Sequence, residues 1–257
     1  MQLLIGDIGN TTTKISIIKL DKYKSFKNLY FDSKKILNNK FLKNKLKIKS
    51  KNINKYALFS SVVPKYESKL KKFLLKNFGI KLIEIKNKNI KKNIIINIKN
   101  KKQVGSDRIA NTISVFNKYK ANCIVVDFGT ATTFDVVTKK GIYNGGVIAP
   151  GVNLSIKNLV YSANQIPSFK LKLQKKIIGK NTKEALRSGF YWGYSGLIKN
   201  IIERIEKESN TKYKIIFTGG FASFFRKSLT RSIIVDKNIT ISGIIEIFKT
   251  NKKYLIK

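Results

Sequence analysis

The amino-acid sequence predicts an α/β protein in which one fold occurs twice. Segments typical of strands alternate with amphipathic helical segments in both halves of the chain. A short acidic motif also occurs twice, at residues 7–13 and 127–133, and 257 residues are enough for two domains of about 120–130 residues each. We therefore expect two domains, residues 1–118 and residues 119–257.

Both copies of the motif have the chemistry of a phosphate-binding turn. They read DIGNTTT and DFGTATT, and each follows an apolar run, Leu3–Ile5 or Ile124–Val126, that predicts a buried strand. The glycine permits a tight turn, backbone N–H groups and threonine hydroxyls can bind phosphate oxygens, and the aspartate can bind a divalent cation. An aspartate that merely forms an Asx turn is the alternative for either copy. The duplication favours two lobes around one nucleotide.

The other elements of the first half follow from periodicity. A second strand is expected at 14–20, a helix and a connection within 33–55, and a strand at 56–63 that ends before Pro64. Residues 67–78 predict an amphipathic helix, and the lysine-, asparagine- and isoleucine-rich stretch 83–102 predicts strand pieces. The segment Gly105–Arg108 opens a helix with Ile109, Ile113 and Phe116 on one face, which places Asp107 near a helix N-terminus.

The second half repeats the strand–turn–strand unit at residues 123–137. Glycines and a proline at 145–151 predict irregular backbone with room for a ligand, and a helix is expected from about 197 to 209. A short buried strand at 215–217 then leads into Thr218-Gly219-Gly220. Gly189, Gly193 and Gly196 have helical spacing, for which close helix packing is a simpler explanation than a ligand.

The composition excludes several classes of protein. There are 53 Lys and Arg against 14 Asp and Glu, a net charge of +39, and no histidine, so neither a Ser-His-Asp triad nor a histidine-ligated metal is possible. The charge alone would suggest nucleic acid. However, the lysines are spread among asparagine and isoleucine, as codon bias produces, and nucleic acid is not expected as a partner.

The cysteine count and the hydropathy bear on location. Cys123 is alone, which rules out an intramolecular disulfide and a cysteine-rich metal site. The N-terminus lacks the basic region of a signal peptide, and no apolar run approaches the ~18 residues of a membrane span. We expect a cytoplasmic protein without a membrane segment.

With so few acids, those in apolar, glycine-containing motifs are informative. Asp7, Asp107, Asp127 and Asp135 belong to this group, and burying a carboxylate is costly without a cation or hydrogen bonds. Asp107 could instead be an N-cap beside Ser106, and an outward-facing strand residue is the preferred interpretation of Asp135. A phosphate cradle, a cation and a carboxylate that accepts a hydroxyl proton are the parts that phosphoryl transfer needs.

The ordered motifs DIGNTTTK, GSDR, DFGTATT, GGVIAPG, NTKEA and TGG resemble the type III pantothenate kinase family of the acetate and sugar kinase/Hsc70/actin superfamily. The resemblance covers about residues 3–220. It implies two ribonuclease H-like (actin-like ATPase) domains with a nucleotide cleft between them. It also implies ATP-dependent phosphorylation of pantothenate, the first step towards coenzyme A, with Mg²⁺, a monovalent cation (K⁺ or NH₄⁺) and a homodimer.

The resemblance also assigns roles to individual residues. The ATP-binding set is Asp7, Ile8, Gly9, Asn10, Thr11, Thr12, Thr13, Lys14 and Thr130, although Lys14 could equally be a plain strand lysine. The substrate-binding set is Gly105, Ser106, Asp107, Arg108 and Thr182, with Asp107 as the catalytic general base and Arg108 suited to a carboxylate. Asp127 matches a ligand of the monovalent cation, and Gly219 and Gly220 would face the adenosine.

Two departures from the family pattern keep alternatives open. The family often has a tyrosine and an Asn-Pro pair where this chain has Ile98 and Asn100-Lys101, so a kinase for another small hydroxylated metabolite remains possible. Ser106 replaces a frequent alanine, which is expected to matter little. A further alternative is a catalytically altered member that acts as a transcription accessory or nucleic-acid-associated protein, against which the intact acids argue.

Overall fold

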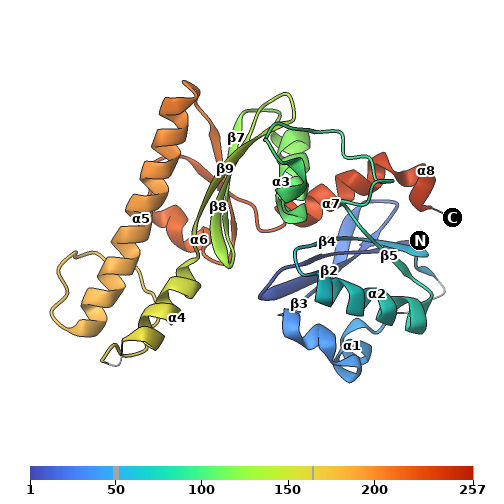
Figure 1. Ribbon diagram of the computed structural model, residues 1–257, viewed down its shortest axis with the longest axis horizontal. Coiled ribbons are helices and arrows are strands. Elements are labelled where there is room, and N and C mark those ends of the chain that lie inside the picture. The colour runs from blue at the N-terminus through green and yellow to red at the C-terminus, as the bar shows by residue number, and fades with distance from the viewer. Residues whose placement is uncertain (49–51, 164, 257) are drawn as a thin grey trace. The chain divides into compact units, whose positions relative to one another are not determined.

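The computed structural model describes residues 1–48, 52–163 and 165–256. The chain divides into two compact units, and Figure 1 labels their helices and strands where there is room. The first comprises Met1–Lys120, Lys140–Ile142 and Asn238–Lys257, and the second comprises Ala121–Lys139 and Tyr143–Lys237. Part of the connection expected within 33–55, residues 49–51, lies outside the described residues.

The first unit contains a five-stranded sheet in the order β3-β2-β1-β4-β5. Its strands are β1 (Gln2–Ile8), β2 (Thr12–Lys19), β3 (Lys24–Asp32), β4 (Tyr56–Ser61) and β5 (Lys81–Glu84). β1, β2 and β3 form an antiparallel meander, whereas β4 lies parallel to β1 and β5 parallel to β4.

The second sheet contains the same plan, because five of its six strands follow the order β9-β8-β7-β10-β11. The strands are β7 (Cys123–Phe128), β8 (Ala131–Val137), β9 (Ile142–Pro150), β10 (Lys214–Gly219) and β11 (Ile233–Val235). β7, β8 and β9 form the antiparallel meander, and β10 and β11 are parallel to β7. Each of these five strands therefore has a counterpart in the first sheet, as the repeated motif predicts.

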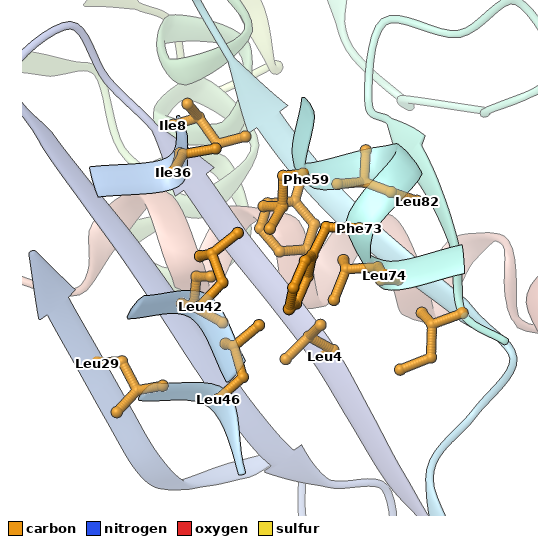
Figure 2. Packing of buried hydrophobic residues seen from close by; sticks show 14 of the residues in the cluster. Leu4, Ile8, Leu29, Ile36, Leu42, Leu46, Phe59, Phe73, Leu74 and Leu82 are labelled. Atoms are coloured by element: carbon orange, nitrogen blue, oxygen red, sulfur yellow. The ribbon is translucent and has the colours of Figure 1, made fainter. Parts of the chain in front are cut away.

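Helices cover both faces of the first sheet. These elements are η1 (Ser33–Leu37), α1 (Asn39–Leu46), α2 (Pro64–Phe78), η3 (Lys101–Gln103), α3 (Ser106–Tyr119), α7 (Ile239–Thr250) and α8 (Lys252–Leu255). Side chains of α1 and α2 pack on Leu4, Ile8 and Phe59 of the sheet (Figure 2). α7 packs against β1 and β4 as well as against α3. Because side chains alternate along a strand, Leu3, Ile5 and Asp7 lie on the face opposite Leu4 and Ile8.

The second unit places its helical core on one face of its sheet. Its helical elements are α4 (Val152–Ser162), α5 (Thr182–Glu208), α6 (Ala222–Phe225) and η4 (Arg226–Ser228). Ile124, Val126 and Phe128 of β7 belong to the core formed with α5 and α6. By the same alternation, Asp127 lies on the other face of β7.

Most of the predicted elements are present, with three corrections. The stretch 145–151 is not irregular, since β9 continues to Pro150. Its glycines instead accommodate a shift of register between β8 and β9, with Gly145 at φ +87°. Residues 83–102 contain strand pieces as predicted, namely the end of β5 and the two-residue strand β6 (Ile95–Ile96), together with η3. β4 ends before Pro64 as predicted, but α2 begins at Pro64 rather than at residue 67, because proline lacks only an N–H that the first helical turn leaves unpaired.

The glycines of α5 provide the third correction. A Cβ at Gly189, Gly193 or Gly196 would meet nothing within 4 Å, so close packing within this chain is not the reason for these residues. Gly243 of α7 does serve close packing, since a Cβ there would lie 1.8 Å from the carbonyl oxygen of Ala110 in α3.

The end of the chain returns to the first unit. Asn238–Lys257 groups with residues of the first half, chiefly through the packing of α7 on α3, whereas the sequence division assigned residues 119–257 to one domain. The boundary expected between residues 118 and 119, where one copy of the fold ends and the next begins, stays a prediction. In the described parts of the chain, no helix combines the length and apolar character that a membrane crossing requires.

Candidate active site

The turn between β1 and β2 is held in shape by Ser33 at the start of η1. The N–H of Gly9 donates to the Thr12 carbonyl at 3.2 Å, and the Ser33 hydroxyl donates to the Gly9 carbonyl at 2.6 Å. The Thr13 hydroxyl is buried and lies 2.8 Å from the Ser33 hydroxyl. Thr13 thus stabilises the turn from within. Asn10, Thr11 and Thr12 form its exposed tip, and Ile8 belongs to the core.

Asp7 lies beside Lys14 of β2 and Ser60 of β4, its neighbours in the sheet register. The pKa of Asp7 is raised from its ordinary 3.8 to about 7, chiefly because partial burial removes water from the carboxylate and also because Asp107 is negatively charged. A hydrogen bond from Ser60 and the charge of Lys14 act in the opposite direction. The structure therefore brings together two acids that are far apart in the sequence.

Lys14 is only 9% exposed and has defined partners. Its ammonium group donates to Asn238 Oδ1 and lies 5.1 Å from the centroid of the Tyr30 ring. Lys14 is therefore not a solvated strand lysine. Its charge faces the same side of the sheet as Asp7.

Asp107 occupies the first turn of α3, where an acidic side chain interacts favourably with the helix dipole. Its Oδ1 accepts the N–H of Arg108 at 2.8 Å. A Cβ on Gly105 would lie 2.4 Å from the same oxygen, so glycine at that position leaves the space that the carboxylate needs. Burial raises the pKa of Asp107, while the backbone hydrogen bond and the charges of Arg108 and Lys86 lower it.

Ser106 anchors the start of α3 to the end of β4. Its hydroxyl accepts the N–H of Ser61 at 2.8 Å and donates to the Ser61 carbonyl at 2.7 Å. The side chain is 1% exposed, so its hydroxyl serves the protein itself. Sequence reasoning missed this positioning role, because the partner residue, Ser61, lies in a strand remote from α3 in the sequence.

In the second unit, Asp127 stands opposite Thr133 of β8 and Thr218 of β10. Gly219 has φ +83°, and a Cβ on it would lie 2.6 Å from Asp127 Oδ1 and 2.6 Å from the Phe128 carbonyl oxygen. The glycine thus leaves open a small space beside two oxygen atoms. The N–H of Gly220 donates to the Phe128 carbonyl at 3.0 Å.

The two acidic turns differ by one residue in register, although their sequences align position by position. Asp7 is opposite Lys14, whereas Asp127 is opposite Thr133, the counterpart of Thr13. The cause lies in the turns. The N–H of Gly9 donates to the Thr12 carbonyl, whereas the N–H of Gly129 donates to the Ala131 carbonyl at 3.0 Å. A shift of one residue exchanges the two faces of a strand. The threonines of the two copies consequently have different surroundings.

The remaining predicted site residues lie in the second unit. Thr130 is exposed, and its carbonyl oxygen would be 2.0 Å from a Cβ on Gly151, the residue that caps α4. Thr182 is exposed at the first position of α5. Its neighbours form a helix cap, in which Asn181 Oδ1 accepts the N–H of Glu184 at 3.0 Å and Glu184 accepts the N–H of Lys180 at 2.9 Å.

The interpretation of Asp135 as an outward-facing strand residue is wrong. The residue is fully buried rather than outward-facing, and its Oδ1 accepts the hydroxyl of Tyr143 at 3.1 Å. Two further acids of the first unit, Glu67 and Glu84, were missed from the sequence. Burial raises the pKa of both, and Glu84 interacts with Ser106 and Lys86. The scarcity of acids was the one sequence signal that could have pointed to them.

The fold defines the class of the protein. Two sheets with one shared strand plan form a duplicated ribonuclease H-like fold, as in the actin-like ATPases and the sugar kinases related to them. A Campylobacter jejuni structure described as belonging to the Baf family of transcriptional activators superposes with a TM-score of 0.63, at 24% identity, over 98% of this chain and 100% of that one. The ethanolamine utilization protein EutJ of Carboxydothermus hydrogenoformans superposes with a TM-score of 0.56, at 13% identity, over 96% of this chain and 90% of that one.

Sequence comparison identifies the family within this class. The family model for type III pantothenate kinase matches residues 3–204. A type III pantothenate kinase of Pelagibacter ubique (strain HTCC1062) is 48% identical over 245 residues, which cover 95% of this chain and 97% of the relative. One from Sulfurihydrogenibium sp. (strain YO3AOP1) is 38% identical over 247 residues, covering 94% and 97%. The chain belongs to the type III pantothenate kinase family.

Proposed function

We propose that this protein transfers the γ-phosphoryl group of ATP to the 4′-hydroxyl of pantothenate, the first step of coenzyme A biosynthesis. Family membership supports the substrate and the reaction. The observation that carries the mechanism is the electrostatic coupling of Asp7, beside the first phosphate turn, to Asp107 at the start of α3. Phosphoryl transfer requires these two functions, cation binding and hydroxyl activation, close to each other.

Asp107 acts as the general base. Its carboxylate takes the proton of the 4′-hydroxyl while the hydroxyl oxygen bonds to the γ-phosphorus and the bond to the β-phosphate oxygen breaks, which releases ADP. Burial raises the pKa of Asp107 and so makes its carboxylate a stronger base than an exposed aspartate. Arg108 supplies a guanidinium group suited to the carboxylate of pantothenate. Gly105, Ser106 and Thr182 complete the substrate-binding set.

The donor groups of this chain fit the two cations. Asp7 offers one carboxylate, and Mg²⁺ in nucleotide sites commonly takes one or two carboxylates and completes its shell with phosphate oxygens and water. Within the described residues, no cluster of three or more His, Cys, Asp or Glu could hold a metal alone, which agrees with a shell shared with the nucleotide. Asp127, next to the space left by Gly219, supplies oxygen to K⁺ or NH₄⁺. These cations offset negative charge on the transferring group.

In the first unit, the exposed tip of the acidic turn is the proposed phosphate-binding segment for ATP. Gly9 and the tip residues Asn10, Thr11 and Thr12 present backbone and hydroxyl groups to phosphate, with Lys14 nearby as a fixed positive charge. Ile8 and Thr13 contribute by keeping the turn in shape. Thr130 makes an ATP contact, and Gly219 and Gly220 face the adenosine.

The protein acts as a homodimer in the cytoplasm. Exposed apolar side chains on α4 and α5 support the dimer, namely Leu154, Leu159, Tyr161 and Trp192. Cys123, buried and unpaired, suits a reducing compartment.

A coupled assay of ADP release tests the proposed function. It compares pantothenate, pantetheine and common sugars, each with and without K⁺. We expect turnover with pantothenate, stimulation by K⁺, and weak turnover with pantetheine, which lacks the carboxylate for Arg108. Turnover with a sugar alone would favour a kinase for another hydroxylated metabolite. Salt-dependent DNA binding without pantothenate-dependent ADP release would favour the non-catalytic alternative.

Asp107→Asn tests the general base. The amide keeps the size of the side chain but cannot accept the proton, so we expect native circular dichroism and a fall in kcat of about 10²–10⁴-fold. Asp21→Asn, at an exposed acid, is the matched control and should retain wild-type turnover. Wild-type rates in Asp107→Asn would remove Asp107 from the mechanism.

A further inference from the structure

Lys86 bridges the end of β5 and the segment that leads into α3. Its backbone N–H donates to Glu84 Oε2 at 2.6 Å, which closes a turn directly after the strand. Its ammonium group donates to the carbonyl oxygens of Lys102 at 2.9 Å and Val104 at 3.0 Å. Val104 is the residue before Gly105, the N-cap of α3. One side chain thus fixes the backbone from which the turn bearing Asp107 begins.

The position of Asp107 depends on a short chain of contacts. Ser106 ties the first turn of α3 to Ser61 of β4, and Gly105 leaves space for the Asp107 carboxylate. Lys86 holds residues 102–104, the segment that enters this turn from its N-terminal side. The anchor at Ser106 and the clamp at Lys86 therefore restrain the same turn from two sides.

We propose that Lys86 is a positioning residue for the Asp107 carboxylate, acting through its clamp on residues 102–104. The inference rests on the proposed role of Asp107 as the general base. Lys86 touches neither substrate nor nucleotide in this account. A small displacement of a catalytic group is enough to reduce turnover strongly, by up to about 10²-fold for 1 Å.

The charges around Asp107 are consistent with this role. Arg108 and Lys86 lower the pKa of Asp107, and Asp7 is the acid coupled to it. Glu84 accepts a hydrogen bond from the backbone N–H of Lys86, and the charge of Lys14 lowers the pKa of Asp7. Removing the Lys86 charge should raise the pKa of Asp107. Since a base works only when unprotonated, the acidic limb of the pH profile should then move to higher pH.

Lys92 provides a matched control within the same lysine-rich stretch. Its ammonium group also donates to two carbonyl oxygens, of Asn87 at 3.2 Å and Ile90 at 2.7 Å, but both belong to its own turn. Lys92→Met also removes an ammonium group that donates to two carbonyl oxygens, but it does not release residues 102–104. Lys86→Arg retains a charge and donors at the clamp.

The test compares Lys86→Met, Lys86→Arg and Lys92→Met with the wild type in two measurements. The first is kcat/KM for pantothenate against pH. We expect Lys86→Met to lose about tenfold in kcat and to shift the acidic limb of the profile to higher pH, with Lys86→Arg restoring most of both effects. The second is amide hydrogen exchange of the ligand-free protein, in which residues 102–109 should exchange about tenfold faster in Lys86→Met alone.

The two measurements separate this inference from the proposed function. If the wild type releases no ADP with pantothenate, the proposed function fails, while faster exchange over residues 102–109 still supports the clamp. If the wild type is active and Lys86→Met matches Lys92→Met in pH profile and exchange, the inference is overturned and the function stands. Lys86→Arg guards against misfolding, because it should retain native circular dichroism whatever Lys86→Met does.

Discussion

Replacing Asp7 by asparagine should stabilise the ligand-free protein at neutral and alkaline pH. The pKa of Asp7 is raised from 3.8 to about 7, so between those pH values the folded chain holds a proton that the unfolded chain has lost. Wild-type stability therefore falls as the pH rises through this window. Asparagine resembles the neutral acid and removes that fall. The gain in free energy of unfolding should grow from about pH 4 and level off above about pH 7.

The size of the gain follows from the same values. A change from 3.8 to about 7 corresponds to about 4 kcal/mol. The Asp7 side chain is partly exposed, so screening by solvent reduces the expected gain to about 2 kcal/mol. The substitution should also abolish pantothenate-dependent ADP release, because the carboxylate proposed to bind Mg²⁺ is gone. Stability and function are then opposed at this position.

Urea unfolding followed by circular dichroism, without nucleotide or divalent cation, measures the effect at pH 4.5 and pH 8.5. Asp7→Asn should gain about 2 kcal/mol at pH 8.5 and less than about half of that at pH 4.5. Asp21→Asn, at an exposed acid in the turn before β3, should stay within about 0.5 kcal/mol of the wild type at both values. An equal gain at both pH values, or a loss at pH 8.5, would refute the account of a carboxylate destabilised by burial and by Asp107.

Glycine substitutions test three other positions. Gly219→Ala should cost roughly 1–2 kcal/mol for its left-handed backbone and weaken activation by K⁺, since its Cβ would lie 2.6 Å from Asp127 Oδ1. Gly79→Ala, at a left-handed glycine (φ +66°) whose Cβ would meet no atom within 4 Å, is the control, and unchanged K⁺ activation in Gly219→Ala would contradict the assignment of Asp127. Gly243→Ala should lower the free energy of unfolding by about 3 kcal/mol, because its Cβ would meet the Ala110 carbonyl at 1.8 Å. Gly196→Ala should instead raise it by up to about 1 kcal/mol, and thermal unfolding of the two variants would show whether their effects have opposite sign.

The sequence predicted best those elements whose apolar residues have a regular period. The strands at both acidic turns, α2, α3, the second half of α5 and β10 carry such patterns and are present. β3 and α4 were not predicted. β3 buries Leu29 and Phe31 on one face, but the exposed Tyr30 between them hides this alternation in the sequence, and α4 buries only Val152. The glycines of β9 likewise gave no local sign of a strand, because glycine is depleted in strands and is typical of turns.

The candidate site shows the same limit. The motifs identified Asp7, Asp107 and Asp127 as candidate site residues. They did not reveal that Asn238 would hold Lys14, or that Ser106 would bind to Ser61. These partners come from segments remote in the sequence, and no local period encodes them.

By itself, the sequence determined the duplicated acidic turns, the family and the residue types available for phosphoryl transfer. The tertiary structure alone decided the coupling of Asp7 to Asp107, the one-residue difference between the two turns and the clamp made by Lys86. The physical reason is that strand periods and turn residues are local properties of the chain. Desolvation, charge coupling and strand register depend instead on which distant segments pack together, and only the folded chain establishes those contacts.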